Sequence, residues 1–125
     1  MIRYDIAERI NKEVNNSIEY VADIVQYGTQ EHWTIPKDGK GDCEDISLAK
    51  RASLIEAGAS SDDIFLCTCT APNGQGHLVL LVMTDKGGMI ADNADDSLRV
   101  PSMLPYTDWN ICKQGKWYKV SWESA

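Results

Sequence analysis

The chain has 125 residues, which suits a single domain, and we expect residues 1–125 to form one domain. Hydrophobic residues make up 43% and charged residues 25%, a globular balance that argues against a disordered chain. The net charge of -7 argues against nucleic acid as a partner, because an acidic surface repels phosphate.

Residues 2–27 are predicted to form an amphipathic helix, with a break allowed near residues 15–16. Apolar residues recur along one face at spacings of three and four, namely Ile6, Ile10, Val14, Ile18, Val21 and Val25. Gly28 suits a helix C-terminus. Pro36, Gly39 and Gly41 then make residues 29–41 a predicted loop.

A second helix is predicted over residues 43–57, with its start inside the segment GKGDCED at residues 39–45. Asp42 suits the N-cap position. Asp45, three residues later, gives a pattern close to a capping box. Cys43 would then stand at the first helical position, where the helix dipole favours the thiolate. The predicted apolar face of this helix consists of Ile46, Leu48 or Ala49, Ala52 and Ile55.

Three carboxylates surround this cysteine: Asp42, Glu44 and Asp45. Their field would disfavour a thiolate, so either a protonated His77 or a bound cation must compensate. Hard cations such as calcium take carboxylate oxygens of this kind. The alternative is that the acids only cap the helix and face water.

The second half of the chain is predicted to be an antiparallel sheet. Strands are expected at Ile64–Thr70 and at residues 77–84, 89–93 and 117–122, with a loop at residues 101–105. Cys67 and Cys69 would point to one face of the first of these strands, as small core residues. Three tryptophans, Trp109, Trp117 and Trp122, are interpreted as packing residues. Helices followed by such strands predict an α+β fold.

His77 and Asp92 are the other candidates for a catalytic role. His77 opens one strand after a Gly-rich turn, and Asp92 closes the next strand. If the two strands pair as a hairpin, both side chains lie near the same end. An aspartate that accepts from the imidazole would fix its tautomer and stabilise its charged form. Taken singly, each residue is equally compatible with a surface or turn position.

Residues 33–93 resemble the bacterial transglutaminase-like cysteine proteinases. The matching pieces are WTIP at 33–36, GDCED at 41–45, Ala49 with Lys50, HLVLL at 77–81 and ADN at 91–93. The resemblance implies a papain-like or transglutaminase-like α+β fold, with the nucleophile helix packed on an antiparallel sheet. It also implies a triad of Cys43, His77 and Asp92, and calcium ligands among Asp42, Glu44 and Asp45.

The function predicted from these residues is a cysteine hydrolase that cleaves peptide or amide bonds of a protein or peptide through a thioester. Backbone N–H groups near Cys43 would stabilise the oxyanion, with a second donor from Gln30, His32 or Trp33. Two alternatives stay open: transglutaminase-type acyl transfer to an amine, and a catalytically silent protein-binding module on the same fold.

Well-known members of the family are periplasmic, calcium-dependent proteases that release adhesins. The present chain is shorter, and residues 1–20 carry charged side chains in place of an apolar signal. Its longest apolar run, residues 78–83, is too short for a membrane span. We therefore expect a cytoplasmic protein without a membrane partner, with a phage-encoded source as one option. The absence of a CxxC pair argues against structural zinc.

Overall fold

The computed structural model describes residues 1–17, 19–20, 40–41 and 43–122, and it describes side chains for residues 1–17 and 45–122. Two helices, α1 (Tyr4–Ser17) and α3 (Cys43–Glu56), precede most of the strands. The strands are β1 (Glu19–Tyr20), β2 (Lys40–Gly41), β3 (Ile64–Thr70), β4 (Gly76–Thr84), β5 (Gly87–Asp92), β6 (Asp95–Arg99), β7 (Thr107–Lys113) and β8 (Lys116–Lys119). Short 3-10 helices lie at Ser61–Asp63 and Pro101–Met103.

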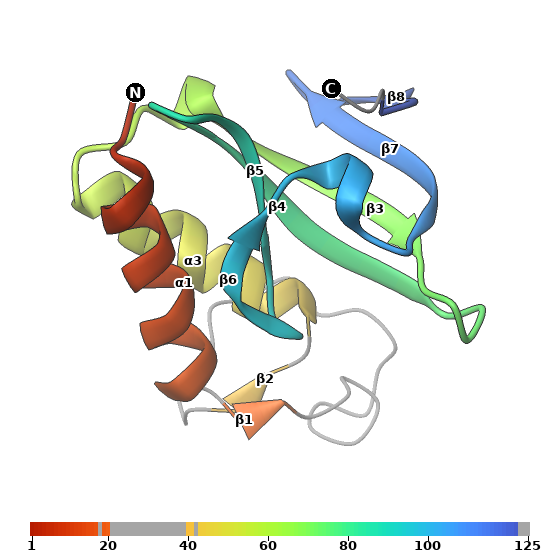
Figure 1. The fold of residues 1–125 in the computed structure, drawn as a ribbon, viewed down its shortest axis with the longest axis horizontal. Coiled ribbons are helices and arrows are strands. Elements are labelled where there is room, and N and C mark those ends of the chain that lie inside the picture. Colours follow the sequence, from red (N-terminus) through yellow and green to blue (C-terminus); the bar gives the residue numbers. More distant parts are fainter. Residues whose placement is uncertain (18, 21–39, 42, 123–125) are drawn as a thin grey trace.

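The longer strands form one antiparallel sheet in the order β6-β5-β4-β3-β7-β8, while β1 and β2 make a small parallel pair. Both helices lie on the same side of the sheet (Figure 1). Helices packed on one face of an antiparallel sheet define an α+β fold, so the predicted fold class is confirmed.

Helix α1 confirms the first part of the predicted N-terminal helix. Ile10 and Val14 from the predicted stripe are buried, and Ile6 packs against the same core. The helix ends at Ser17, close to the break that the sequence allowed, and the helix predicted at residues 19–20 is wrong because Glu19–Tyr20 is a strand. At this end Asn16 Nδ2 and Ser17 Oγ donate to the carbonyls of Lys12 and Val14, side-chain bonds that compete with further backbone bonds of the helix. Ile18, Val21, Val25 and residues 29–39 of the predicted loop lie outside the described residues, while the last two residues of that loop form strand β2.

Helix α3 begins at Cys43, as the sequence predicts; its predicted apolar face is confirmed at Ile46 and Ala49 and is wrong at Ala52 and Ile55. The side chains that face the sheet are Ile46, Ser47, Lys50 and Leu54, each at most 3% exposed. Ala52 is exposed and Ile55 is 37% exposed. The buried stripe was hidden in the sequence because a lysine and a serine occupy two of its positions.

The sheet contains all four predicted strands and two more. Predicted strands 77–84 and 89–93 correspond to β4 and β5, and the last predicted strand is the shorter β8. Strands β6 and β7 were missed because polar residues make up most of the segments DDSLR and TDWNICK. Trp109 is buried as predicted, but Trp117 is 48% exposed, because it lies on an edge strand exposed along its whole length.

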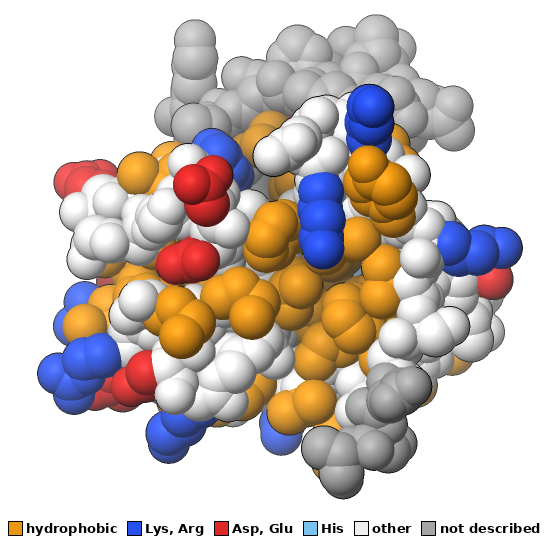
Figure 2. Space-filling view, turned by 90° about the horizontal axis from the view of Figure 1, so that it is seen from above, with side chains coloured by type: hydrophobic (Ala, Val, Ile, Leu, Met, Phe, Trp, Pro, Cys, Tyr) orange, Lys and Arg blue, Asp and Glu red, His pale blue; other side chains and the backbone are white. Residues whose placement is uncertain are grey.

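Two apolar clusters lie on opposite faces of the sheet. The cluster beneath the helices joins residues of α1 and α3 to Leu80, Val82 and Ala91 of the sheet. The other contains Cys67, Cys69, Trp109 and Ile111, and Trp122 packs edge-on against Trp109. Cys67 and Cys69 are thus core residues, as predicted. Seen from above, apolar side chains gather at the centre of the surface, with Lys and Arg side chains among and around them (Figure 2).

Within the described part of the chain, neither helix has the length and apolar character needed to cross a membrane.

Candidate active site

The hairpin of β4 and β5 brings His77 and Asp92 together. Leu80 pairs with Ala91 in this hairpin, and the same register places Asp92 opposite Val79, two residues along the strand from His77. Both side chains therefore lie on one face of the sheet as diagonal neighbours, which are within reach of each other. His77 Nε2 lies 2.7 Å from Asp92 Oδ1, so the predicted meeting of these two residues is confirmed.

Asp92 is a buried carboxylate with three hydrogen-bond donors. Its side chain is 3% exposed and accepts from His77 Nε2, from the backbone N–H of Ala94 at 3.0 Å and from Tyr106 Oη at 2.6 Å. Burial alone would raise the pKa of Asp92, but the bonds from His77, Tyr106 and Ala94 outweigh it and lower the pKa below its ordinary value. The carboxylate is therefore ionised at neutral pH, and because it accepts only, the shared proton belongs on Nε2.

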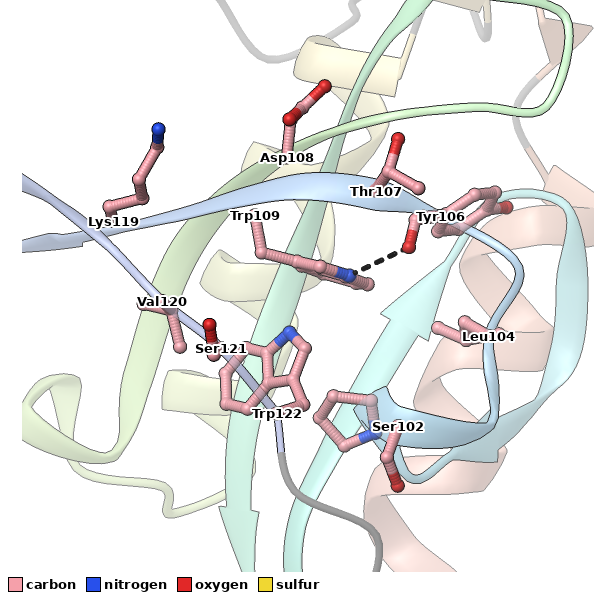
Figure 3. Close-up of a pocket in the computed structure, with 11 residues that line it drawn as sticks. Ser102, Leu104, Tyr106, Thr107, Asp108, Trp109, Lys119, Val120, Ser121 and Trp122 are labelled. Carbon is pink, nitrogen blue, oxygen red and sulfur yellow. Dashed lines mark hydrogen bonds between the residues drawn. The ribbon is translucent and has the colours of Figure 1, made fainter.

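Tyr106 is a site residue that the sequence analysis missed. Besides its bond to Asp92, its ring packs edge-on against His77, with 5.3 Å between ring centroids. Its carbonyl accepts a bond from Trp109 Nε1 at 3.2 Å, which ties Tyr106 to the buried tryptophan (Figure 3). Burial, followed by the bond to Asp92, raises the pKa of Tyr106, so its hydroxyl stays a donor. No sequence pattern marks this tyrosine, since it lies in an irregular segment before β7.

The N-terminal end of helix α3 lies near the start of β4, the strand end that carries His77. Ser47, one helical turn after Cys43, donates from Oγ to the carbonyl of Leu78 at 3.3 Å. Leu78 is the residue next to His77. The first turn of α3 thus lies beside the start of β4. The side chains of Cys43 and Glu44, and all of Asp42, lie outside the described residues, whereas Asp45 is fully buried.

Cys67 and Cys69 are too buried to act as nucleophiles. Cys67 is fully buried, and burial raises the pKa of its thiol to about 12. Cys69 is buried too, with its sulfur 3.7 Å from the carbonyl oxygen of His77. Cys112 is partly exposed on β7 and belongs to neither catalytic element. Among the described side chains, no group of three or more His, Cys, Asp or Glu residues is arranged to hold a metal ion.

A helix that begins with cysteine, packed on an antiparallel sheet that carries a His–Asp pair, defines the transglutaminase-like class of fold. The family model described as "Bacterial transglutaminase-like cysteine proteinase BTLCP" matches residues 3–124. The chain therefore belongs to this family, and it is a transglutaminase-like cysteine protease.

Solved structures support the same fold. The chain is similar to calcium-bound LapG of Legionella pneumophila, with a TM-score of 0.76 and 22% identity over 95% of this chain and 70% of that one. LapG of the same organism without a stated ligand gives 0.73, with 23% identity over 90% and 66% of the two chains. EGTA-treated LapG gives 0.68, with 26% identity over 81% and 58%. No curated protein matches the chain significantly.

Proposed function

We propose that the chain hydrolyses peptide bonds through a triad of Cys43, His77 and Asp92. The observation that carries the proposal is the buried bond between His77 and Asp92, at the strand end that faces the first turn of α3. A histidine held by an ionised carboxylate is a general base of fixed tautomer. Cys43 at the start of the helix is the nucleophile, because the dipole of α3 favours a thiolate there.

The bond to Asp92 determines which ring nitrogen of His77 takes part in proton transfer. Since Nε2 is bound to Asp92, Nδ1 is the ring nitrogen that exchanges a proton with Cys43. The thiolate attacks the carbonyl carbon, the S–C bond forms, and Nδ1 gives its proton to the leaving amine as the C–N bond breaks. Water activated by Nδ1 then hydrolyses the thioester and restores the thiol. Backbone N–H groups at the start of α3 stabilise the oxyanion in both steps.

Calcium fits the acidic residues around Cys43. Relatives of this fold have been solved as calcium-bound and EGTA-treated LapG. In the present chain Asp42, Glu44 and Asp45 would supply hard carboxylate oxygens, the donors that calcium takes. The carboxyl group of Asp45 is fully buried, where a nearby cation would offset its charge. Bound calcium would neutralise the acids beside Cys43 and so favour its thiolate.

The triad is tested by labelling with a thiol-directed probe at neutral pH. We expect fast labelling of the wild type, loss of that label in Cys43→Ala and no change in Cys67→Ala. Cys67→Ala is the matched control because its thiol is buried and its pKa is high. Slow and equal labelling of all four cysteines would contradict the proposed enzymatic activity and favour a binding module on the same fold.

Hydrolysis is separated from acyl transfer with an unstructured protein substrate and a labelled amine. We expect peptide fragments without incorporation of the amine. Incorporation without cleavage would assign transglutaminase chemistry to the same triad.

Calcium binding is tested by the melting temperature of chelator-treated protein. We expect added calcium to raise the melting temperature, and Asp42→Ala with Glu44→Ala to abolish the rise, because a ligand that binds only the folded state stabilises it. If added calcium does not change the melting temperature of the wild type, these acids serve only as helix caps.

A further inference from the structure

Lys50 lies at the centre of the buried stripe of α3. It stands four residues after Ile46 and four before Leu54, and these two residues pack with Ala91 in the cluster beneath the helices. Lys50 itself is 1% exposed. Its side chain is therefore inside the layer between α3 and the sheet, next to the strand that ends in Asp92.

The amine of Lys50 is buried without a hydrogen bond to any described residue. A buried amine without partners destabilises the folded state, and proteins rarely keep one for packing alone. Burial lowers the pKa of Lys50 to about 7, and the charges of Asp92 and Asp96 oppose that shift. The amine is thus within electrostatic reach of the catalytic carboxylate and is partly charged near neutral pH.

The turn that carries Asp92 is fixed from the other helix as well. Asn15 of α1 donates from Nδ2 to the carbonyls of Asp92 and Asp95, and Asn11 donates to the carbonyls of Asp95 and Asp96. Neutral amides from α1 therefore hold the backbone of this turn. On the side of α3, the nearby cationic group is the buried amine of Lys50, which feels the charge of Asp92.

We propose that Lys50 is a positioning residue that acts through Asp92, and that its charge weakens the hold of Asp92 on the proton shared with His77. A buried carboxylate with no nearby cation would stabilise the protonated imidazole strongly. The imidazole must nevertheless release a proton to the leaving amine in each cycle. A positive charge behind Asp92 reduces that stabilisation and keeps the imidazole able to give up its proton. The inference rests on the proposed function.

The test measures the proton affinity of His77 directly by NMR. The chain has only two histidines, so labelled imidazole signals are assigned with His32→Gln. The titration is made in a Cys43→Ala background, so that the Cys43 thiol does not titrate together with His77. The midpoint then reports the proton affinity of His77 beside Asp92 and the neighbouring groups. The titratable and charged groups on the neighbouring elements are Asp92 on β5, Tyr106 before β7 and Asp96 on β6, with Lys50 and Asp45 on α3.

We expect Lys50→Met to raise the titration midpoint of His77 by about half a pH unit or more, because removing a positive charge favours proton binding nearby. Lys50→Arg keeps the charge and should keep the midpoint. Lys12→Met removes a charge from the exposed face of α1 and is the matched control. If Lys50→Met does not fold, Lys50→Gln gives the same comparison.

Stability separates this role from a packing role. Lys50→Met should melt at the same or a higher temperature, since it replaces a buried amine with an apolar group of similar shape. An unmoved His77 midpoint in folded Lys50→Met would overturn the proposal, whether or not the melting temperature changes. Because the titration is made without the Cys43 thiol, its failure is distinct from failure of the labelling experiment that tests the triad.

Discussion

The two helices share one apolar layer but differ in what they bury. Helix α1 buries Ala7, Ile10 and Val14 at regular helical spacing. Helix α3 buries Ile46 and Leu54 with Lys50 and Ser47 between them. Helix α1 also buries the neutral amide of Asn11, which donates to the turn after Asp92, whereas α3 buries an amine. The comparison indicates that polar residues replace apolar ones at core-facing positions of both helices, and that only α3 brings a titratable group into the layer.

The largest effect is expected at Asp92, whose backbone is held by Asn15 of α1 and whose charge acts on Lys50 of α3. Asp92→Asn keeps the shape but removes the charge, so the imidazole loses its fixed tautomer and the support of its charged form. We expect kcat/KM to fall by roughly 10⁴-fold, the scale seen when a triad carboxylate is replaced by its amide. Cleavage rates of wild type and variant at equal folded concentration measure it. A loss below tenfold would mean that Asp92 is not part of the catalytic group.

The same substitution changes how stability depends on pH. The pKa of Asp92 is lowered in the folded protein, so its ionised form stabilises the fold above its ordinary value of 3.8. That stability is lost as the pH falls through the lower, folded-state pKa. Urea unfolding followed between pH 6 and pH 2 should show this loss in the wild type. In Asp92→Asn the corresponding part of the pH dependence should be missing.

An intermediate effect tests which face of α3 is buried. Leu54 is 1% exposed, whereas Ile55, which the sequence pattern favoured, is 37% exposed. We expect Leu54→Ala to reduce the free energy of unfolding by about 3 kcal/mol, as for a buried leucine that leaves a cavity. Ile55→Ala is the control and should cost less than about 1 kcal/mol, since it removes little buried area. Chemical denaturation measures both, and equal losses would contradict the observed stripe.

The sequence predicted most of what periodicity and turns control. The start of α3 at Cys43, strand β3 and the β4–β5 hairpin are confirmed, because capping signals, β-branched runs and turn residues are local. Strands β6 and β7 were missed because their residues are largely polar, and pairing with neighbours far along the chain defines them. Propensity within a short segment cannot carry that information.

The candidate site was predicted in the same uneven way. His77 and Asp92 lie near each other in the chain and share a hairpin, so the predicted turn was enough to predict that they lie close together. Tyr106 donates to Asp92 from a loop before β7, and the buried amine of Lys50 on α3 feels the charge of Asp92. Only the packed fold places these residues around one carboxylate. The position of the Cys43 sulfur stays a prediction, because that side chain lies outside the described residues.

The smallest of these effects is expected at Tyr106, on the face of the sheet away from the helices. Tyr106→Phe keeps the ring against His77 and removes only the hydroxyl that donates to Asp92 Oδ2 at 2.6 Å. A hydrogen bond to a charged group contributes about 1.5–3 kcal/mol. Asp92 keeps the donors His77 and Ala94, so we expect the lower end of that range and a loss of about tenfold in kcat/KM.

The matched control is Tyr118→Phe, which removes a hydroxyl from a ring that is 50% exposed on β8. It should leave both activity and stability unchanged. Loss of the Tyr106 hydroxyl also raises the pKa of Asp92, because a bond that favours the ionised form is gone. The acid loss of stability should therefore begin at a higher pH in Tyr106→Phe than in the wild type. Unchanged activity and an unchanged acid transition together would show that the tyrosine only fills space beside the imidazole.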